Sequence, residues 1–282
     1  MLPASDPRLW LWIGAVFYGL AFAYTLIQLL RERPQGRLFF YALLIGGFLF
    51  QSIGLYLRGL STGVVPLSNP MEILQVIAWT IIFMDLVIRA VFRLKLLGFF
   101  SCGLAALLGL LALAVPGWDG SVRGSGLLNN PWVEFHALLA IFSYGVFALL
   151  AIVALMYLLQ HYGLTHKRSR GLFMFLPAIR QLDIVGGRLL ALGVCALTLS
   201  VAIGTLKWLI SPEALGAIKL LVALAVWLAY LILLIVRTRR WLMAQSFAWL
   251  ALGLFAVAML SLWPLNREPV EEERPMASSP LR

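Results

Sequence analysis

The sequence carries a single histidine inside its long apolar runs. His136 follows Asn130-Pro131-Trp132 at the start of an apolar run that continues to Gln160. This run has the length of a bilayer-spanning helix, and ionisable groups inside a membrane are costly, so they usually mark functional sites. Imidazole also has no long stem with which to reach water. His136 is therefore the first candidate for a ligand or a proton carrier.

Two charged residues are expected at the same depth as His136. Pro131 suits the first turn of a helix, and at about 1.5 Å per residue His136 lies about 8 Å below that helix end. Glu72, which follows Ser68-Asn69-Pro70, and Lys219 each stand near the start of another apolar run. Charges at this depth pair or line a cavity. Glu72 can also act as a first-turn carboxylate, and Lys219 can also snorkel to the interface.

Four further residues complete the candidate site. Tyr144 shares a helical stripe with His136, and Trp227 is a candidate for lining a cavity. Asn69 and Trp132 stand at the starts of the two runs that carry the acidic residue and the histidine. Tryptophans near span ends are also common interfacial anchors, which is the plainer interpretation for most of them.

The composition places the chain in a membrane. Of its 282 residues 62% are hydrophobic, and the formal charge of +10 comes from basic residues in short clusters between apolar runs. Such clusters are topology signals rather than a nucleic-acid-binding face, and the unbroken runs exclude a membrane β-barrel. Cys102 and Cys195 form no metal or redox spacing. The sequence contains no nucleophile elbow or phosphate-binding loop, so we do not expect an enzyme.

The apolar runs predict an all-α polytopic membrane protein, a bundle of about eight transmembrane helices. Residues 1–263 are expected to form one transmembrane domain, and residues 264–282 a disordered, acidic and proline-rich outer tail. A short cytoplasmic interfacial helix is expected between Gly171 and Asp183, where apolar and basic residues mix. The predicted spans are Leu9–Leu30, Leu38–Leu57, Pro70–Val91, Leu96–Val115, Trp132–Gln160, Ile184–Ile210, Leu215–Val236 and Trp241–Trp263.

The basic residues predict the orientation in the membrane. They gather in the odd-numbered connections, at Arg31–Arg37, Arg89–Lys95, Lys167–Arg180 and Arg237–Arg240. These connections are therefore expected in the cytoplasm, with both termini on the outer, periplasmic side of a bacterial inner membrane. Asp85 stands four residues before Arg89, a spacing that predicts a local ion pair.

Three stretches of the sequence resemble one known family. They are His136-x7-Tyr144 in the fifth run, the segment LPAIRQLDIVGGRLLALGVCALTLSVAIGTL, and Lys219-x7-Trp227-x2-Tyr230. Their order and spacing resemble the cytochrome c assembly protein family, the CcsA/CcmC-type haem-handling membrane proteins, and most of all its short branch that includes YpjD and HemX. The resemblance covers roughly Ser68 to Trp263.

The resemblance implies a haem cofactor. In the full-length haem exporters of this family, outward-facing histidines ligate haem iron beside a WGxxWxWD-type loop. His136 matches the first of these histidines, which implies an axial ligand, and Lys219, Lys207 and Arg123 are candidates to pair with the propionates. The connection from Lys207 to Gly216 lacks that loop, and no second histidine is expected on the outer side.

Two functions follow, and a third is weaker. The first is haem binding and handling in cytochrome c biogenesis, with other assembly proteins and apocytochrome c as expected partners. The alternative is an accessory or regulatory membrane protein that acts through a partner without binding haem, with the basic loop Lys167–Arg180 as its docking surface. A transporter built on Glu72, His136 and Lys219 ranks last, because inverted repeats and broken helices do not stand out. Membrane lipid is expected around the protein in every case, and nucleic acid is a partner in none.

Overall fold

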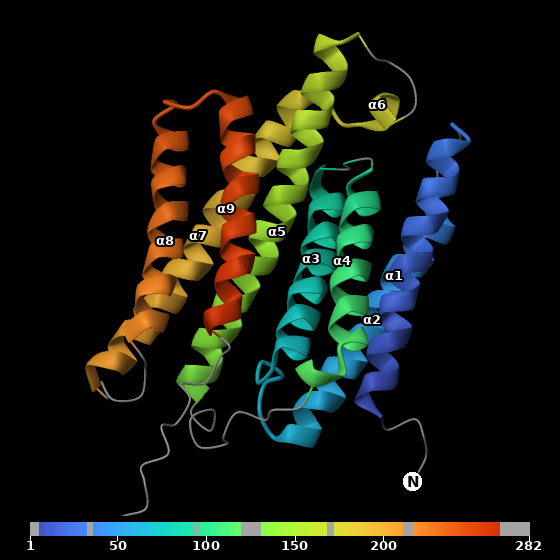
Figure 1. Cartoon of the computed structure of the whole chain (residues 1–282). Coiled ribbons are helices and arrows are strands. Elements are labelled where there is room, and N and C mark those ends of the chain that lie inside the picture. Colours follow the sequence, from blue (N-terminus) through green and yellow to red (C-terminus); the bar gives the residue numbers. More distant parts are fainter. Residues whose placement is uncertain are drawn as a thin grey trace, which may run out of the picture.

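The computed structural model confirms an all-α membrane protein (Figure 1). It describes residues 6–32, 36–92, 94, 96–119, 131–167, 172–210 and 217–265, without the side chains of 207–210, 217–219 and 263–265. Eight helices in this part of the chain are long and apolar enough to cross a membrane. They are α1 (Pro7–Leu30), α2 (Arg37–Thr62), α3 (Pro70–Phe92), α4 (Leu97–Ala114), α5 (Pro131–Thr165), α7 (Ile179–Ile210), α8 (Ala217–Thr238) and α9 (Ala244–Leu265). Two shorter helices are a 3-10 turn, Pro116–Trp118, and α6 (Leu172–Phe175).

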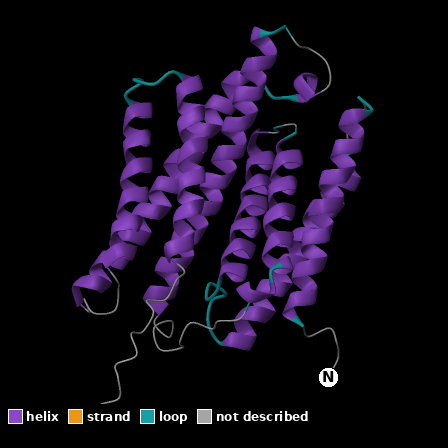
Figure 2. Ribbon diagram, in the orientation of Figure 1, coloured by secondary structure: helices purple, strands orange, loops and turns teal. Residues whose placement is uncertain are grey.

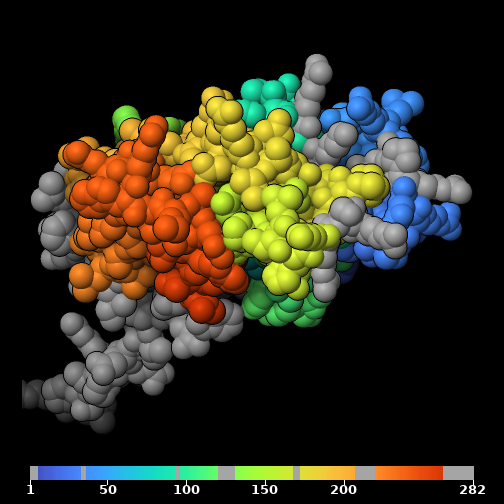
Figure 3. Space-filling model, turned by 90° about the horizontal axis from the view of Figure 1, so that it is seen from above, coloured from blue at the N-terminus to red at the C-terminus, as the bar shows by residue number. Residues whose placement is uncertain are grey.

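Helix α5 lies at the centre of the bundle. Figure 1 shows α1 to α4 on one side of it and α7 to α9 on the other, and Figure 2 shows the helices in purple and the described loops in teal. Along its 35 residues α5 packs against α3, α7 and α9. Seen from above in Figure 3, the molecule is elongated, and the end of α5 lies between the N-terminal and C-terminal helices. A residue on α5 can therefore touch both groups of helices.

Consecutive long helices run in opposite directions, so the ends of α1, α5 and α8 share one end of the bundle (Figure 1). Arg31, Lys167 and Arg239 follow these three helices within two residues. The basic connections that predict a cytoplasmic face therefore lie at a common end, and the first turns of α1, α3, α5 and α8 lie at the other.

Local sequence sets several helix boundaries. Asp6 caps α1, because its Oδ1 accepts a hydrogen bond from the Arg8 backbone N–H at 2.9 Å. Asn69 caps α3 in the same way, with its Oδ1 2.9 Å from the Glu72 backbone nitrogen. Helix α2 ends at Thr62, and Gly63 caps it with a φ of 71°, in the left-handed region that glycine adopts without a steric penalty.

A chain of side-chain hydrogen bonds crosses the first four helices in the interior of the bundle. The Tyr18 hydroxyl of α1 donates to Gln51 Oε1 of α2 at 2.8 Å, and Gln51 Nε2 donates to Gln75 Oε1 of α3 at 2.8 Å. Gln75 Nε2 donates in turn to the Gly109 carbonyl of α4 at 3.1 Å. The three side chains are at most 1% exposed. Because each donor finds an acceptor on the next helix, this chain fixes the relative positions of α1 to α4.

Some boundaries differ from the predicted spans. Helix α2 continues past Leu57 to Thr62 and so contains Arg58. The predicted interfacial helix is limited to the four residues of α6, because the chain from Ile179 onward already belongs to α7. Asp85 and Arg89 do form the predicted ion pair, with Arg89 Nε 2.8 Å from Asp85 Oδ2. Beyond the last two residues of α9, the predicted outer tail lies outside the described residues.

Candidate functional site

His136 lies near the start of α5 and contacts one residue of α7. Its Nδ1 is 2.6 Å from the Ser200 carbonyl oxygen and 3.0 Å from Ser200 Oγ. Ser200 Oγ also donates to the His136 carbonyl oxygen at 2.9 Å. A carbonyl oxygen can only accept, so the proton of a neutral His136 ring belongs on Nδ1. The lone pair of Nε2 is then available to a ligand.

The imidazole ring packs closely against α7 at Gly204, one turn after Ser200. A Cβ atom added at Gly204 would lie 2.6 Å from His136 Cε1 and 3.3 Å from its Nε2. Any larger residue would displace the ring. Because the ring is also held at Nδ1, its orientation is determined by α7 rather than by α5 alone.

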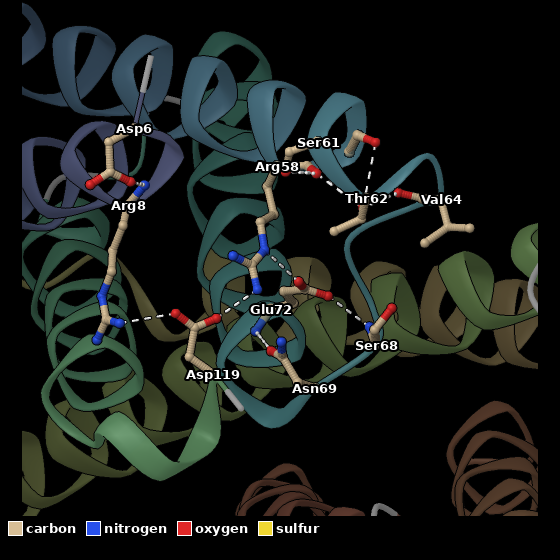
Figure 4. Close-up of polar contacts among 11 residues, drawn as sticks. Asp6, Arg8, Arg58, Ser61, Thr62, Val64, Ser68, Asn69, Glu72 and Asp119 are labelled. Atoms are coloured by element: carbon tan, nitrogen blue, oxygen red, sulfur yellow. Dashed lines mark hydrogen bonds and ion pairs between the residues drawn. The ribbon is translucent and has the colours of Figure 1, made fainter. Parts of the chain in front are cut away.

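Glu72 and Asn69 form a separate cluster at the start of α3, drawn in Figure 4. Glu72 is 1% exposed, and its Oε1 lies 2.7 Å from Arg58 Nε of α2. Its Oε2 accepts from the Ser68 backbone N–H at 2.7 Å. Among the described side chains, Glu72 and His136 share no hydrogen bond or ion pair. The expected cluster of Glu72 and His136 is therefore not formed by direct contact.

Arg58 and Asp119 extend this cluster across the N-terminal helices (Figure 4). Arg58 Nη2 lies 2.6 Å from Asp119 Oδ1, and Arg8 Nη1 lies 2.9 Å from Asp119 Oδ2. Arg8 Nη2 also donates to the Leu113 carbonyl at the end of α4. Two arginines and two carboxylates thus join α1, α2, α3 and the end of α4, and their formal charges cancel.

Two aromatic residues predicted for the site, Tyr144 of α5 and Trp227 of α8, lie further along their helices than His136 does. The Tyr144 hydroxyl is 3.4 Å from Ser261 Oγ of α9, and Tyr144 is 5% exposed. Trp227 Nε1 of α8 donates to Thr198 Oγ1 of α7 at 2.9 Å. Tyr144 and Trp227 therefore link α5 to α9 and α8 to α7. They belong to the same four-helix group as His136.

A stacked aromatic pair connects α5 to α8. The rings of Phe147 and Tyr230 are parallel within 3°, with centroids 3.6 Å apart. Both side chains are almost completely buried, and the Tyr230 hydroxyl has no hydrogen-bond partner in the part of the chain that the structure describes. Phe147 lies three turns beyond His136 along α5. This pair therefore fills the interior below the histidine.

The remaining candidates lie at the edge of the site or outside the described residues. Trp132 is 66% exposed at the start of α5, which is typical of an interfacial tryptophan. The side chains of Lys219 and Lys207 and the whole of Arg123 lie outside the described residues. Within the described ranges, no group of three or more His, Cys, Asp and Glu side chains is arranged to hold a metal ion.

Sequence reasoning missed Ser200, Gly204, Arg58, Asp119 and Arg8 as parts of these clusters. Only Arg58 and Asp119 carried a signal, since a cation and a carboxylate near the membrane surface at the same end of the bundle are expected to pair. Ser200 and Gly204 look like ordinary small residues of a transmembrane helix.

Comparison with known proteins identifies the family. Residues 67–263 match the family described as Cytochrome C assembly protein. Protein HemX of Bacillus subtilis (strain 168) is 27% identical over 258 residues, which cover 89% of this chain and 92% of that protein. Protein HemX of Brevibacillus brevis is 29% identical over 206 residues, which cover 70% of this chain and 75% of that protein. With most of its length matched, and with the eight apolar helices that the resemblance implied, the chain belongs to the cytochrome c assembly protein family.

Proposed function

We propose that this membrane protein binds haem non-covalently near the first turns of α5, with His136 Nε2 as an axial ligand. The observation that carries the proposal is the 2.6 Å contact between His136 Nδ1 and the Ser200 carbonyl oxygen. It assigns the ring proton to Nδ1 and leaves Nε2 as the ligand nitrogen. Histidines that bind metals characteristically donate their other nitrogen to a carbonyl or carboxylate.

The surroundings of His136 also fit a haem. Haem iron can be held by one imidazole from the protein, so one histidine ligand is sufficient, and the porphyrin requires apolar side chains around it. The helices that surround α5 on this side, α7, α8 and α9, are themselves largely apolar. Family membership supports haem rather than another cofactor, because cytochrome c assembly handles haem. The role we propose is binding and transfer, without a catalytic step.

We also propose that His136 faces the periplasm of a bacterial cell. The basic residues at the opposite end of the bundle favour a cytoplasmic location for that end. Haem bound at His136 would then lie on the side where apocytochrome c receives it. Other cytochrome c assembly proteins and apocytochrome c are the partners that this role requires.

Haemin titration tests the proposal directly. The full-length protein in detergent or nanodiscs is titrated with haemin, and the Soret band is compared among wild type, His136→Ala and His161→Ala. His161 is the matched control, because it also lies on α5 but near its other end. We expect a saturable Soret band that His161→Ala preserves and His136→Ala abolishes or shifts. A band that is equal in all three proteins, or absent from wild type, would contradict haem ligation by His136.

A second candidate function is an accessory role through a partner, without haem. Exposed Lys167 and Arg180 lie at the cytoplasmic end proposed for α5 and α7, next to α6. This basic surface fits an acidic protein partner or anionic lipid headgroups. Purification from native membranes separates the two functions. The accessory role predicts that a partner protein co-purifies with the wild type and is lost from Lys167→Glu/Arg180→Glu. It also predicts that the membrane protein itself shows no Soret band when haemin is added.

A further inference from the structure

We propose that Ser200 is the positioning residue that holds His136 as a ligand, and that Gly204 makes the space in which the ring is held. This inference rests on the proposed function, because it assigns the residues that prepare His136 for iron. Neither residue would touch the iron. They act through the orientation and the protonation of the imidazole.

Ser200 holds both the ring and the backbone of His136. The Ser200 hydroxyl has one proton, which it donates to the His136 carbonyl at 2.9 Å. Its oxygen therefore acts as an acceptor towards His136 Nδ1 at 3.0 Å, beside the carbonyl oxygen of the same residue at 2.6 Å. The Nδ1 proton thus has two acceptors, both from Ser200. This arrangement disfavours the tautomer with the proton on Nε2, in which Nε2 has no lone pair for iron.

The hydroxyl of Ser200 differs from the other hydroxyls of α7. Serine and threonine in transmembrane helices commonly donate to the carbonyl four residues earlier in their own helix. Thr198 and Thr205 do so, donating to Val194 and Val201 at 2.7 Å and 2.9 Å. Ser200 instead reaches across to α5. Helix packing alone does not require this contact, because a small residue at position 200 would pack equally closely.

Gly204 is likewise distinguished from another glycine of the same helix. A Cβ at Gly204 would overlap His136 Cε1 at 2.6 Å, whereas a Cβ at Gly187 would meet nothing within 4 Å. Alanine at position 204 therefore pushes the ring away from Ser200, and alanine at position 187 does not. The two substitutions have the same chemistry on the same helix, so they form a matched pair.

The first test examines the protein without haem. Nitrogen NMR of the full-length protein labelled at histidine reports which ring nitrogen carries the proton, and His136→Ala assigns the signal among the three histidines. We expect His136 protonated on Nδ1 in wild type and in the controls Gly187→Ala and Thr205→Val. In Gly204→Ala we expect a mixture of tautomers. A wild-type ring protonated on Nε2, or a signal that Gly204→Ala leaves unchanged, would overturn the inference.

The second test examines the protein with haem bound. Removal of a group that supports a metal ligand weakens binding about 10- to 100-fold, and Ser200→Ala retains the backbone carbonyl, so we expect about tenfold weaker haem binding. We also expect a more positive reduction potential, because loss of an acceptor at Nδ1 makes the imidazole a weaker donor to iron. Ser200→Thr keeps the hydroxyl and should restore both values. A purely structural role would not move the potential.

The outcomes separate this inference from the proposed function. If haem binding depends on His136 but Ser200→Ala matches wild type in affinity and potential, Ser200 has no positioning role and the proposed function stands. If the wild-type protein binds no haem, both the proposed function and the role of Ser200 as a positioning residue are contradicted. Thermal unfolding of each variant is measured alongside, and Thr205→Val controls for the loss of a hydroxyl from the same part of α7.

Discussion

Arg58 of α2 forms an ion pair with Glu72 of α3, with Nε 2.7 Å from Oε1. The match to the cytochrome c assembly family begins at residue 67, so this pair joins a helix outside the matched region to the first turn of the first helix within it. Asp119, which follows the 3-10 turn after α4, binds the same guanidinium. The α1–α2 hairpin is thereby attached to the family domain by charge as well as by packing.

Loss of Arg58 should destabilise the protein strongly. Arg58→Met leaves the carboxylate of Glu72, which is 1% exposed, without its cation. An unpaired buried charge costs about 3 kcal/mol or more, whereas replacing both partners by apolar residues is often nearly neutral. We therefore expect the unfolding temperature in detergent to be much lower in Arg58→Met than in wild type, and to be partly restored in Arg58→Met/Glu72→Met. Arg31→Met, at an exposed arginine, is the control. A double variant less stable than Arg58→Met would contradict this account.

The interior hydrogen-bond chain gives a second prediction. Gln51→Leu removes the bonds to Tyr18 and Gln75 and leaves both side chains buried without those partners. Each hydrogen bond makes a net contribution of about 1 kcal/mol to stability, so we expect the free energy of unfolding to fall by about 1–3 kcal/mol. Gln28→Leu is the matched control, because Gln28 makes a 3.3 Å bond to Tyr24 in a partly buried position. Equal stability of the two variants would show that the chain does not hold α1 to α4 together.

The eight long helices could be predicted from the sequence because a transmembrane helix is a local property of its own apolar run. The Asp85–Arg89 pair was predictable for the same reason, since its partners are one turn apart on one helix. Contacts between helices are different. Whether Glu72 meets Arg58, His136 or Lys219 depends on which faces of the helices turn towards one another, and apolar runs of nearly uniform hydrophobicity do not define those faces.

The surroundings of His136 were unpredictable for a related reason. A serine in a transmembrane helix has a ready acceptor in its own backbone, so Ser200 carries no sequence signal that it donates to His136 of another helix. Gly204 also carries no sequence signal, because its role is to leave space for the His136 ring. Histidine itself was informative, since an imidazole within an apolar run is rare and costly.

The orientation in the membrane can be tested by labelling. In a background without Cys102 and Cys195, a single cysteine is placed at the exposed positions 61 or 239, which lie at opposite ends of the bundle. We expect a membrane-impermeant maleimide to label Ser61→Cys in intact bacterial spheroplasts and Arg239→Cys only after permeabilisation. The reverse pattern would place His136 on the cytoplasmic side and would contradict the proposed periplasmic haem site.

Chemical rescue measures most directly whether His136 ligates haem. His136→Gly removes the imidazole, and free imidazole is then added to the haemin-loaded protein. The account predicts that the absorption and resonance Raman spectra of wild type are lost in His136→Gly and return with imidazole, while His161→Gly behaves as wild type throughout. Spectra that survive in His136→Gly without imidazole would show that His136 is not the ligand of the iron.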